Sequence, residues 1–456
     1  MRPPFALALL SLVLGCRTSD TVTVDPEPTK PVEAKPKAEP KAPALASDVA
    51  RLREHVEFLA ADAQLGRPPG TDADRRVQDY VEAEWKLAGL RPAFGDAYRQ
   101  PFDVTDGVRA VGEPSLAIGK DAVPFGLVPF TTATKTPVSA PLVFVGHGLA
   151  PDGKGSGDYK GIEAAVKGSI VVALGGAPQD DPHLSPAVTR PQSKLIAARD
   201  HGAVGFILWE PKLEVPYPNH GEANDLGLPA LWVGKPGSEA LAKALGAKPE
   251  QGVEALKVGR KSKGKTKATL ATPVEPVVLS TANVSGVLPG REGSPVLVVG
   301  AHMDHLGEGT SSSLAPGVKD VHNGADDNAS GVAVILEVAR VLGALPVAER
   351  PYTVVFVAFG AEEMGLLGSK HYVENLPPAL RGRMVAMLNF DMVGRLGDEQ
   401  DLVIAGMGTS SVWPELVERT RAEQEIRSSD DGYGASDQTS FYEAGLPVLH
   451  FFTGTH

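Results

Sequence analysis

The residues best suited to metal chemistry begin with His302 and Asp304, which follow an apolar run, 296–299, that predicts a buried strand. Polar residues in this place lie at the carboxyl end of a strand, where open α/β sheets form their ligand-binding crevice. An HxD pair alone is a weak signal. Asp326 and Asp327 strengthen it, because adjacent carboxylates at a predicted helix start repel each other unless a cation lies beside them. The alternative for this second pair is a purely structural helix cap.

Two further predicted strands lead into acidic residues. The run 353–359 is followed by Glu362 and Glu363, and the run 384–390 leads directly into Asp391. Three strands and one helix start therefore bring histidine or carboxylate side chains to one edge of the predicted sheet. Oxygen and imidazole ligands without thiolates suit Zn²⁺, Mn²⁺ or Co²⁺, and neighbouring acids suit a two-metal hydrolytic site.

The elements that must position these residues indicate an α/β domain over 277–456. Apolar runs of strand length alternate there with stretches of helical periodicity. Because the runs are apolar throughout, we expect strands that are buried on both faces. Two helices are predicted upstream, over about 48–59 and 74–87, and short apolar runs between Gly and Pro turns predict a β-rich module over 137–267.

Length and composition limit the possible classes of protein. The chain has 456 residues, enough for two or three domains, and a formal net charge of −12. A negative surface repels phosphate backbones, so we expect no nucleic acid partner. The single cysteine, Cys16, excludes an intrachain disulfide.

The first sixteen residues, 1–16, have the pattern of an export signal. Arg2 precedes the apolar stretch 5–14, which is too short to span a bilayer as a helix. The stretch leads into Val-Leu-Gly-Cys16, which resembles the lipobox of bacterial lipoproteins, where the cysteine carries the lipid anchor. The alternative is an ordinary secretory peptide that contains a cysteine. The Pro-, Lys-, Glu- and Ala-rich segment 17–46 predicts a disordered tether.

Five motifs in order closely resemble the M28 family of zinc aminopeptidases: AHMDHLG, GADDNASG, GAEEMGLLGS, LNFDMVG and GLPVLHFFTGTH. The resemblance implies an α/β fold in which helices flank a mixed sheet, with catalytic residues in 277–456. The segment 47–136 is similar to the N-terminal part of the family's peptidase domain. The module 137–267 resembles the protease-associated insert found in many members.

The resemblance also implies a set of metal ligands. His302 and Asp391 would hold one zinc ion, Glu363 would bind a second, and Asp327 would bridge the two. The Asp327–Asn328 peptide bond is cis in the family, which aims the bridging carboxylate.

Two other acidic residues match supporting roles in the family. Glu362 matches the general acid/base, which takes a proton from water and returns it to the leaving amine. Asp304 matches the carboxylate that orients the imidazole of His302.

Two departures from the family pattern concern the C-terminal part of the site. The family has a further ligand histidine shortly after the FFTG-x-H segment, and the sequence stops at His456, so we expect a truncated chain with one of its two zinc ions weakly bound. His456 aligns with a histidine that does not bind metal, and His450 is expected in the core. Gln438 stands where many relatives have histidine, and we expect it in the pocket wall.

The resemblance implies an exopeptidase that removes N-terminal residues from peptides. We expect an exported enzyme of the cell envelope, anchored through lipid on Cys16 to a bacterial membrane, with the outer membrane favoured. A relative of other specificity, such as a carboxypeptidase or a glutaminyl cyclase, is one alternative. A non-catalytic, receptor-like binding protein on the same fold is another, and the presence of Glu362 beside the ligands argues against it. The oligomeric state stays open.

Overall fold

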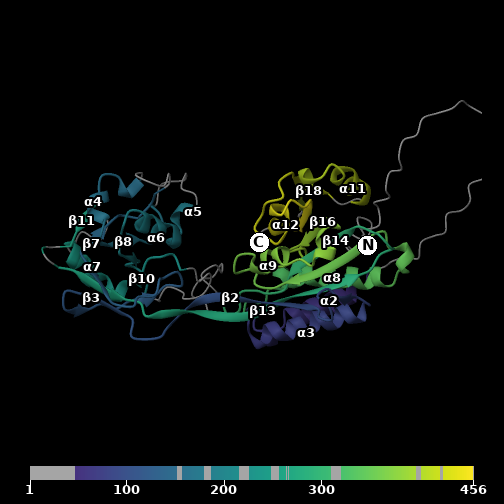
Figure 1. Ribbon diagram of the computed structural model, residues 1–456, viewed down its shortest axis with the longest axis horizontal. Helices are drawn as coiled ribbons and strands as arrows, with labels where there is room; N and C mark the ends of the chain where they lie inside the picture. The colour runs from purple at the N-terminus through teal and green to yellow at the C-terminus, as the bar shows by residue number, and fades with distance from the viewer. Residues whose placement is uncertain are drawn as a thin grey trace, which may run out of the picture. The chain divides into compact units, whose positions relative to one another are not determined.

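The computed structural model describes residues 47–150, 157–178, 186–214, 225–247, 256–262, 264, 266–309, 320–396, 402–421 and 425–454 (Figure 1). The predicted export signal lies outside these residues. The chain divides into two compact units, the first made of Met1–Asp103, Ser280–Glu308 and Lys319–His456, and the second of Val104–Leu279 and Gly309–Val318. No helix within the described ranges is long and apolar enough to cross a membrane.

A mixed sheet forms the centre of the first unit. Its middle strands β15, β14, β16 and β19 are parallel, whereas β13 runs antiparallel to β15 and β17 runs antiparallel to β19. Among the described residues the order is β1-β13-β15-β14-β16-β19-β17-β18, with β2 also paired to β13. The strands are β1 Arg91–Pro92, β2 Arg99–Ala110, β13 Val274–Leu288, β14 Val296–His302, β15 Thr353–Phe359, β16 Met384–Phe390, β17 Leu402–Ala405, β18 Ile426–Ser429 and β19 Val448–Phe452.

Alternate residues of the middle strands pack into two separate cores, because successive side chains of a strand point to opposite faces. On β14, Leu297 and Val299 pack with residues of α2, α3, α8 and α11, whereas Val296 and Val298 pack with residues of α9 and α12. The predicted mixed sheet flanked by helices is thus confirmed. The helices are α2 Val49–Leu59, α3 Asp72–Leu87, α8 Gly331–Gly343, α9 Leu367–Glu374, α10 Pro378–Arg381, α11 Trp413–Thr420 and α12 Gln438–Glu443.

The two N-terminal helices begin at side-chain caps, as polar residues at a helix start often do. Asp48 accepts the backbone N–H of Ala50 at the start of α2, and Thr71 accepts that of Asp74 at the start of α3. Both helices agree with the predicted ranges to within two residues.

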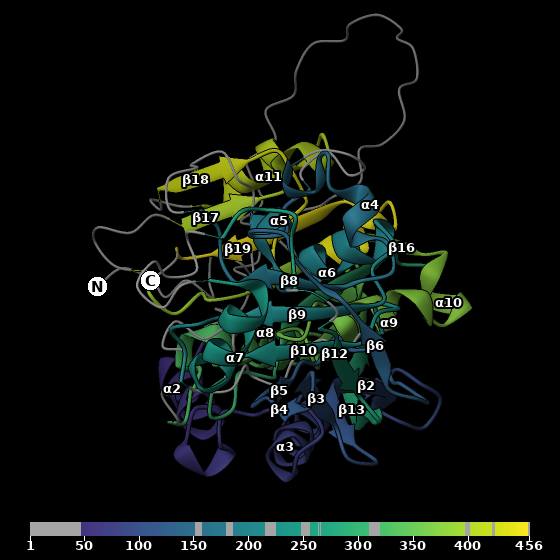
Figure 2. The ribbon, with the colours of Figure 1, turned by 90° about the vertical axis from the view of Figure 1, so that its left-hand side faces the viewer.

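The second unit contains two smaller sheets, and the predicted module 137–267 lies within it. In one sheet the strands β7, β8, β9 and β10 run parallel side by side, as Figure 2 shows for β8 to β10, with β11 and β5 at its edges. These strands are β5 Gly126–Leu127, β7 Leu142–Phe144, β8 Ile170–Leu174, β9 Gly205–Trp209, β10 Ala230–Val233 and β11 Arg260–Lys261.

The other sheet of this unit has the order β4-β3-β12-β6 among the described residues. Its strands are β3 Ser115–Ile118, β4 Asp121–Ala122, β6 Val138–Ala140 and β12 Ala268–Ala271. The helices of this unit are α4 Glu163–Val166, α5 Pro186–Thr189, α6 Pro191–Asp200 and α7 Lys235–Leu245.

Candidate metal centre

Three neighbouring parallel strands and one helix start carry the predicted site residues. β14 ends at His302, the turn after β15 contains Glu362 and Glu363, and Asp391 directly follows β16. Asp327 belongs to the short segment that precedes α8. Because the carboxyl ends of parallel neighbours lie at one edge of a sheet, these side chains are brought together there.

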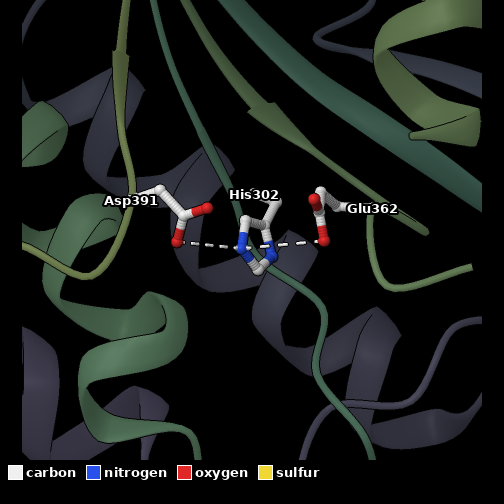
Figure 3. A group of neighbouring side chains, drawn as sticks. All are labelled: His302, Glu362 and Asp391. Atoms are coloured by element: carbon white, nitrogen blue, oxygen red, sulfur yellow. Dashed lines mark hydrogen bonds and ion pairs between the residues drawn. The ribbon is translucent and has the colours of Figure 1, made fainter. Parts of the chain in front are cut away.

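The first group of potential ligands consists of the buried residues His302, Glu362 and Asp391 (Figure 3). His302 Nε2 lies 3.3 Å from Asp391 Oδ1 and 3.9 Å from Glu362 Oε2. One ligand atom from each residue lies within 4.8 Å of the other two. Since zinc–ligand bonds are about 2 Å long, a single cation can reach all three residues after small movements.

The second group consists of His305, Asp327 and Glu363. His305 Nδ1 lies 2.7 Å from Glu363 Oε1 and 3.9 Å from Asp327 Oδ1. The sequence analysis did not assign His305 to the site, although this residue belongs to the AHMDHLG motif. A second imidazole three positions after His302 was the signal that could have identified it.

Asp327, a member of the second group, also faces the first group. Its Oδ1 atom is 3.3 Å from His302 Nε2 and 3.9 Å from His305 Nδ1, so one carboxylate faces both imidazoles. The peptide bond between Asp327 and Asn328 is cis, as the resemblance implies. Asn328 is buried and donates from Nδ2 to the carbonyl oxygen of Phe390 at 2.9 Å, which ties this segment to the end of β16.

Asp304 holds the turn that carries the two glutamates. Its carboxylate accepts the backbone N–H of Glu362 at 3.0 Å and that of Glu363 at 3.3 Å. The predicted partner, His302, has Nδ1 3.8 Å from the Asp304 carboxylate and 3.3 Å from the Asp304 carbonyl oxygen. Burial raises the pKa of Asp304 to about 6.

The electrostatics of the first group favour a bound cation. Burial lowers the pKa of His302, but Glu362 and Asp391 outweigh this effect and hold the pKa well above 6.5. Burial raises the pKa of Glu362 well above its usual value, and the nearby acids Asp437 and Asp391 raise it further. Buried acids crowded in this way repel one another until a positive charge is placed among them.

Arg67 supplies one positive charge close to both groups. Its buried guanidinium donates hydrogen bonds to five carbonyl oxygens, those of Leu59, Met303, Asn323, Gly324 and Asp327. Burial lowers its pKa to about 10, while the nearby site carboxylates act in the opposite direction, so the side chain stays protonated at neutral pH. The sequence analysis gave Arg67 no role.

The residues next to Glu362 and Asp391 adopt left-handed backbone conformations. Ala361, directly before Glu362, has a φ angle of 56°, and Met392, directly after Asp391, has a φ angle of 51°. Such conformations cost on the order of 1 kcal/mol each and persist where the surrounding structure imposes them, often at functional sites. They mark the two turns in which the chain leaves β15 and β16.

Gln438 and His450 contact β16 and belong to neither group of potential ligands. Asn389 Nδ2 donates to Gln438 Oε1 at 3.0 Å and lies 3.3 Å from His450 Nδ1. Burial lowers the pKa of His450, which favours its neutral form. Both side chains therefore contact Asn389, two residues before the predicted ligand Asp391.

Comparison with known proteins bears on the family of this chain. Residues 283–456 match the model of Peptidase family M28. An aminopeptidase of Pseudomonas aeruginosa is 36% identical over 195 residues, which cover 40% of this chain and 33% of that protein. Aminopeptidase YwaD of Bacillus subtilis is 39% identical over 135 residues, 29% of each chain. A probable lipoprotein aminopeptidase of Mycobacterium tuberculosis, LpqL, is 28% identical over 383 residues, 77% of this chain and 71% of that protein.

Two solved structures share the fold over most of the chain. The aminopeptidase from Aneurinibacillus sp. strain AM-1 matches with a TM-score of 0.57 and 24% identity, covering 90% of this chain and 85% of that one. BSAP, a zinc aminopeptidase from Bacillus subtilis, matches with a TM-score of 0.60 and 24% identity, covering 90% and 86%. The matches to the Pseudomonas and Bacillus sequences above span about a third of those relatives. The family match and the named relatives support the expected relationship to peptidase family M28, and the two structures support the fold.

The donor atoms of both groups fit zinc. Each group combines one imidazole with two carboxylates, and neither offers a thiolate. Imidazole with carboxylate is a usual ligand set for hydrolytic zinc, which keeps three protein ligands and leaves a position open.

Proposed function

We propose that this protein is a metal-dependent aminopeptidase with a co-catalytic site for two zinc ions. The observation that carries the proposal is the presence of two adjoining groups of potential ligands at one sheet edge, with Asp327 facing the imidazoles of both. His302, Asp391 and Asp327 are the proposed ligands of one ion. Glu363 and Asp327 are proposed ligands of the other.

Zinc, when bound, supplies a Lewis acid that polarises the scissile carbonyl and makes nearby water more acidic. The chain's own acid/base group in this proposal is Glu362. Its buried carboxylate is placed to accept a proton from the attacking water and to return it to the leaving amine. A pKa raised by burial suits this role, because proton transfer in both directions is most efficient when the pKa lies near the working pH.

Peptides with a free N-terminus are the proposed substrates. The relatives from Pseudomonas and Bacillus carry the name aminopeptidase, which supports this choice over carboxypeptidase and glutaminyl cyclase activities. The test is a panel of aminoacyl-coumarin substrates, each with its N-acetylated counterpart. We expect release of coumarin from the free amines only. Cleavage of the acetylated compounds at equal rates would contradict exopeptidase specificity, and no cleavage of either would favour a receptor-like protein.

The module 137–267 is proposed to be a protease-associated insert that selects substrates and supplies no metal ligand. Two of its histidines support this view, since both have local partners. His147 Nδ1 lies 3.2 Å from the carbonyl oxygen of Gly175, and His201 stacks on Tyr159 with ring centroids 4.3 Å apart.

The proposed location is the cell envelope, with a lipid anchor on Cys16. The matching lipoprotein aminopeptidase of Mycobacterium supports this reading of the lipobox-like segment. Detergent-phase partitioning of the wild-type protein and of Cys16→Ser tests it. We expect the variant to move to the aqueous phase, because 17–46 contains little that is apolar.

A further inference from the structure

The second unit carries a basic surface in a protein whose formal net charge is −12. Five exposed side chains make up this basic surface: Lys120, Lys257, Arg260, Lys261 and Lys267. None of them belongs to either group of potential metal ligands. The exposed Asp121 directly follows Lys120 and offsets one of the positive charges. The basic surface is therefore a local exception to the negative charge of the chain.

Two hydrogen bonds bring together the four basic residues between 257 and 267. The N–H of Arg260 donates to the carbonyl oxygen of Lys257 at 3.0 Å, which closes a turn at the start of β11. Ser262 Oγ then donates to the carbonyl oxygen of Thr266 at 2.7 Å, which brings the chain back beside the end of β11.

The fifth residue, Lys120, comes from the turn between β3 and β4. The carbonyl oxygen of Lys267 accepts the N–H of Gly119 at 2.9 Å, so Lys120 lies close to Lys267. Residues of β3, β7, β12 and α7 pack in one apolar core. Since β11 pairs with β7 and Lys267 directly precedes β12, this core holds the basic surface in a fixed arrangement.

The charges of the four lysines are available to a partner. Within the described ranges, the lysine ion pairs are those of Lys86 and Lys235, and none includes a lysine of the basic surface. Arg260 Nε donates to the carbonyl oxygen of Leu245 at 3.0 Å, which holds this side chain at the end of α7. Val258, within the same surface, is 43% exposed. Basic side chains around an exposed apolar one suit the interface of an anionic membrane.

Protection of a sheet edge explains only part of the basic surface. Among the described residues β11 lies at the edge of its sheet, and lysines on an edge strand discourage pairing with another chain. Lys267, however, precedes β12, which lies between β3 and β6 in the other sheet, and Lys120 lies in a turn. Because neither residue is on an edge strand, their charges call for another explanation.

We propose that the basic surface binds the headgroups of an anionic phospholipid membrane. Nucleic acid is the competing anionic partner, but proteins that bind single strands offer aromatic side chains on which the bases stack. The exposed apolar residue among these five charges is a valine, which favours the membrane. The proposed lipid anchor would hold this surface near a membrane, and the inference does not depend on the proposed peptidase activity.

The test is sedimentation of the full chain with lipid vesicles, in a Cys16→Ser background so that lipid on the cysteine does not contribute. The vesicles are made of phosphatidylcholine, alone or with about one third phosphatidylglycerol. We expect clearly tighter binding to the anionic vesicles. This preference should be lost as the salt concentration rises from about 50 to about 300 mM, because salt screens exposed charges. Equal binding to both kinds of vesicle at low salt would overturn the proposal.

The triple variant Lys257→Gln, Lys261→Gln and Lys267→Gln removes three charges from the basic surface. Each basic residue near an anionic membrane contributes about fivefold to the partition coefficient. We therefore expect the triple variant to bind the anionic vesicles on the order of 100-fold more weakly.

The matched control is the triple variant Lys135→Gln, Lys167→Gln and Lys212→Gln. It removes the same charge at three exposed lysines of the same unit. We expect this control to change binding by only a few-fold, since charge outside the contact acts at longer range and is screened. Equal binding by the two triple variants would overturn the proposal.

Further measurements separate the competing explanations. If the basic surface only protects a sheet edge, the first triple variant should aggregate yet keep its vesicle binding, which would overturn the proposal. Tighter binding of a single-stranded oligonucleotide than of anionic vesicles would also overturn it. Hydrolysis of soluble aminoacyl-coumarin should be unchanged in both triple variants, because the substituted lysines belong to neither group of potential ligands. A protein that binds anionic vesicles but cleaves no substrate would remove the proposed function and leave this inference in place.

Discussion

Asp304 Oδ1 accepts the backbone N–H of Glu362 at 3.0 Å. The other oxygen of the same carboxylate accepts the N–H of Glu363 at 3.3 Å. One buried acid therefore fixes the turn that carries both the proposed general base and a proposed ligand. Support of this kind keeps reactive side chains in place and usually affects metal affinity as well as stability.

Asp304→Asn should weaken the site without removing any proposed ligand. The substituted side chain keeps one oxygen, but its NH₂ group faces an N–H donor, so one buried hydrogen bond is lost. We expect the free energy of unfolding to fall by about 1–3 kcal/mol and zinc affinity to fall about 10- to 100-fold. Denaturant unfolding and competitive zinc titration measure the two effects. Unchanged zinc affinity would mean that Asp304 does not position the ligands.

Glu362→Gln should separate catalysis from metal binding. The amide cannot take a proton from water, so we expect kcat to fall by at least about 10²-fold. Zinc content and melting temperature should stay close to those of the wild type. Glu363→Gln is the matched comparison, and it should lose metal instead. A Glu362 variant of normal activity would exclude Glu362 as the acid/base group.

Arg67→Lys should destabilise the first unit although it preserves charge. Lysine cannot donate to all five carbonyl oxygens that the guanidinium reaches. We expect a loss of about 3–5 kcal/mol in the free energy of unfolding, together with weaker zinc binding. The control is Arg75→Lys. Arg75 forms an exposed ion pair with Asp72 on α3, so this variant should change the free energy of unfolding by less than about 1 kcal/mol. Equal stability of the two variants would contradict this role of Arg67.

Because His55 is buried in its neutral form, the free energy of unfolding should fall as the pH becomes acidic. Its imidazole is buried on α2, with Nδ1 2.6 Å from the hydroxyl oxygen of Tyr80, and burial lowers its pKa from 6.5 to about 4. Between these two pH values the unfolded chain binds a proton that the folded chain does not, so stability falls as the pH falls through this window. His55→Gln should reduce that slope by at most about 1.4 kcal/mol per pH unit. The measurement is urea unfolding at a series of pH values, and an unchanged slope in the variant would contradict the assignment.

Much of this molecule could be predicted from short-range patterns in its sequence. The apolar runs around 296–299 and 353–359 predict strands β14 and β15, because a strand covered on both faces carries few polar residues. The polar residues after each run lie at one edge because the strands are parallel neighbours. Asp48 and Thr71 begin α2 and α3 close to where the periodicity starts.

Contacts between distant parts of the chain could not be predicted in this way. The role of Arg67 depends on carbonyl oxygens more than 200 residues away, and neither periodicity nor spacing reports such contacts. His305 was missed for a related reason. Its neighbour Glu363 is 58 positions further along the chain, and the two meet only through the parallel pairing of β14 with β15.

The most direct test of a zinc-dependent aminopeptidase at this site is the return of activity to metal-free protein. The measurement is the rate of coumarin release from a free aminoacyl substrate as zinc is added stepwise to the chelated full-length chain. We expect almost no rate without metal and a rise that continues beyond one equivalent as the more weakly bound second ion is added, with the same titration of Glu362→Gln staying flat. A metal-free protein that cleaves the substrate at the full rate, or a zinc-loaded protein that does not cleave it, would contradict the account.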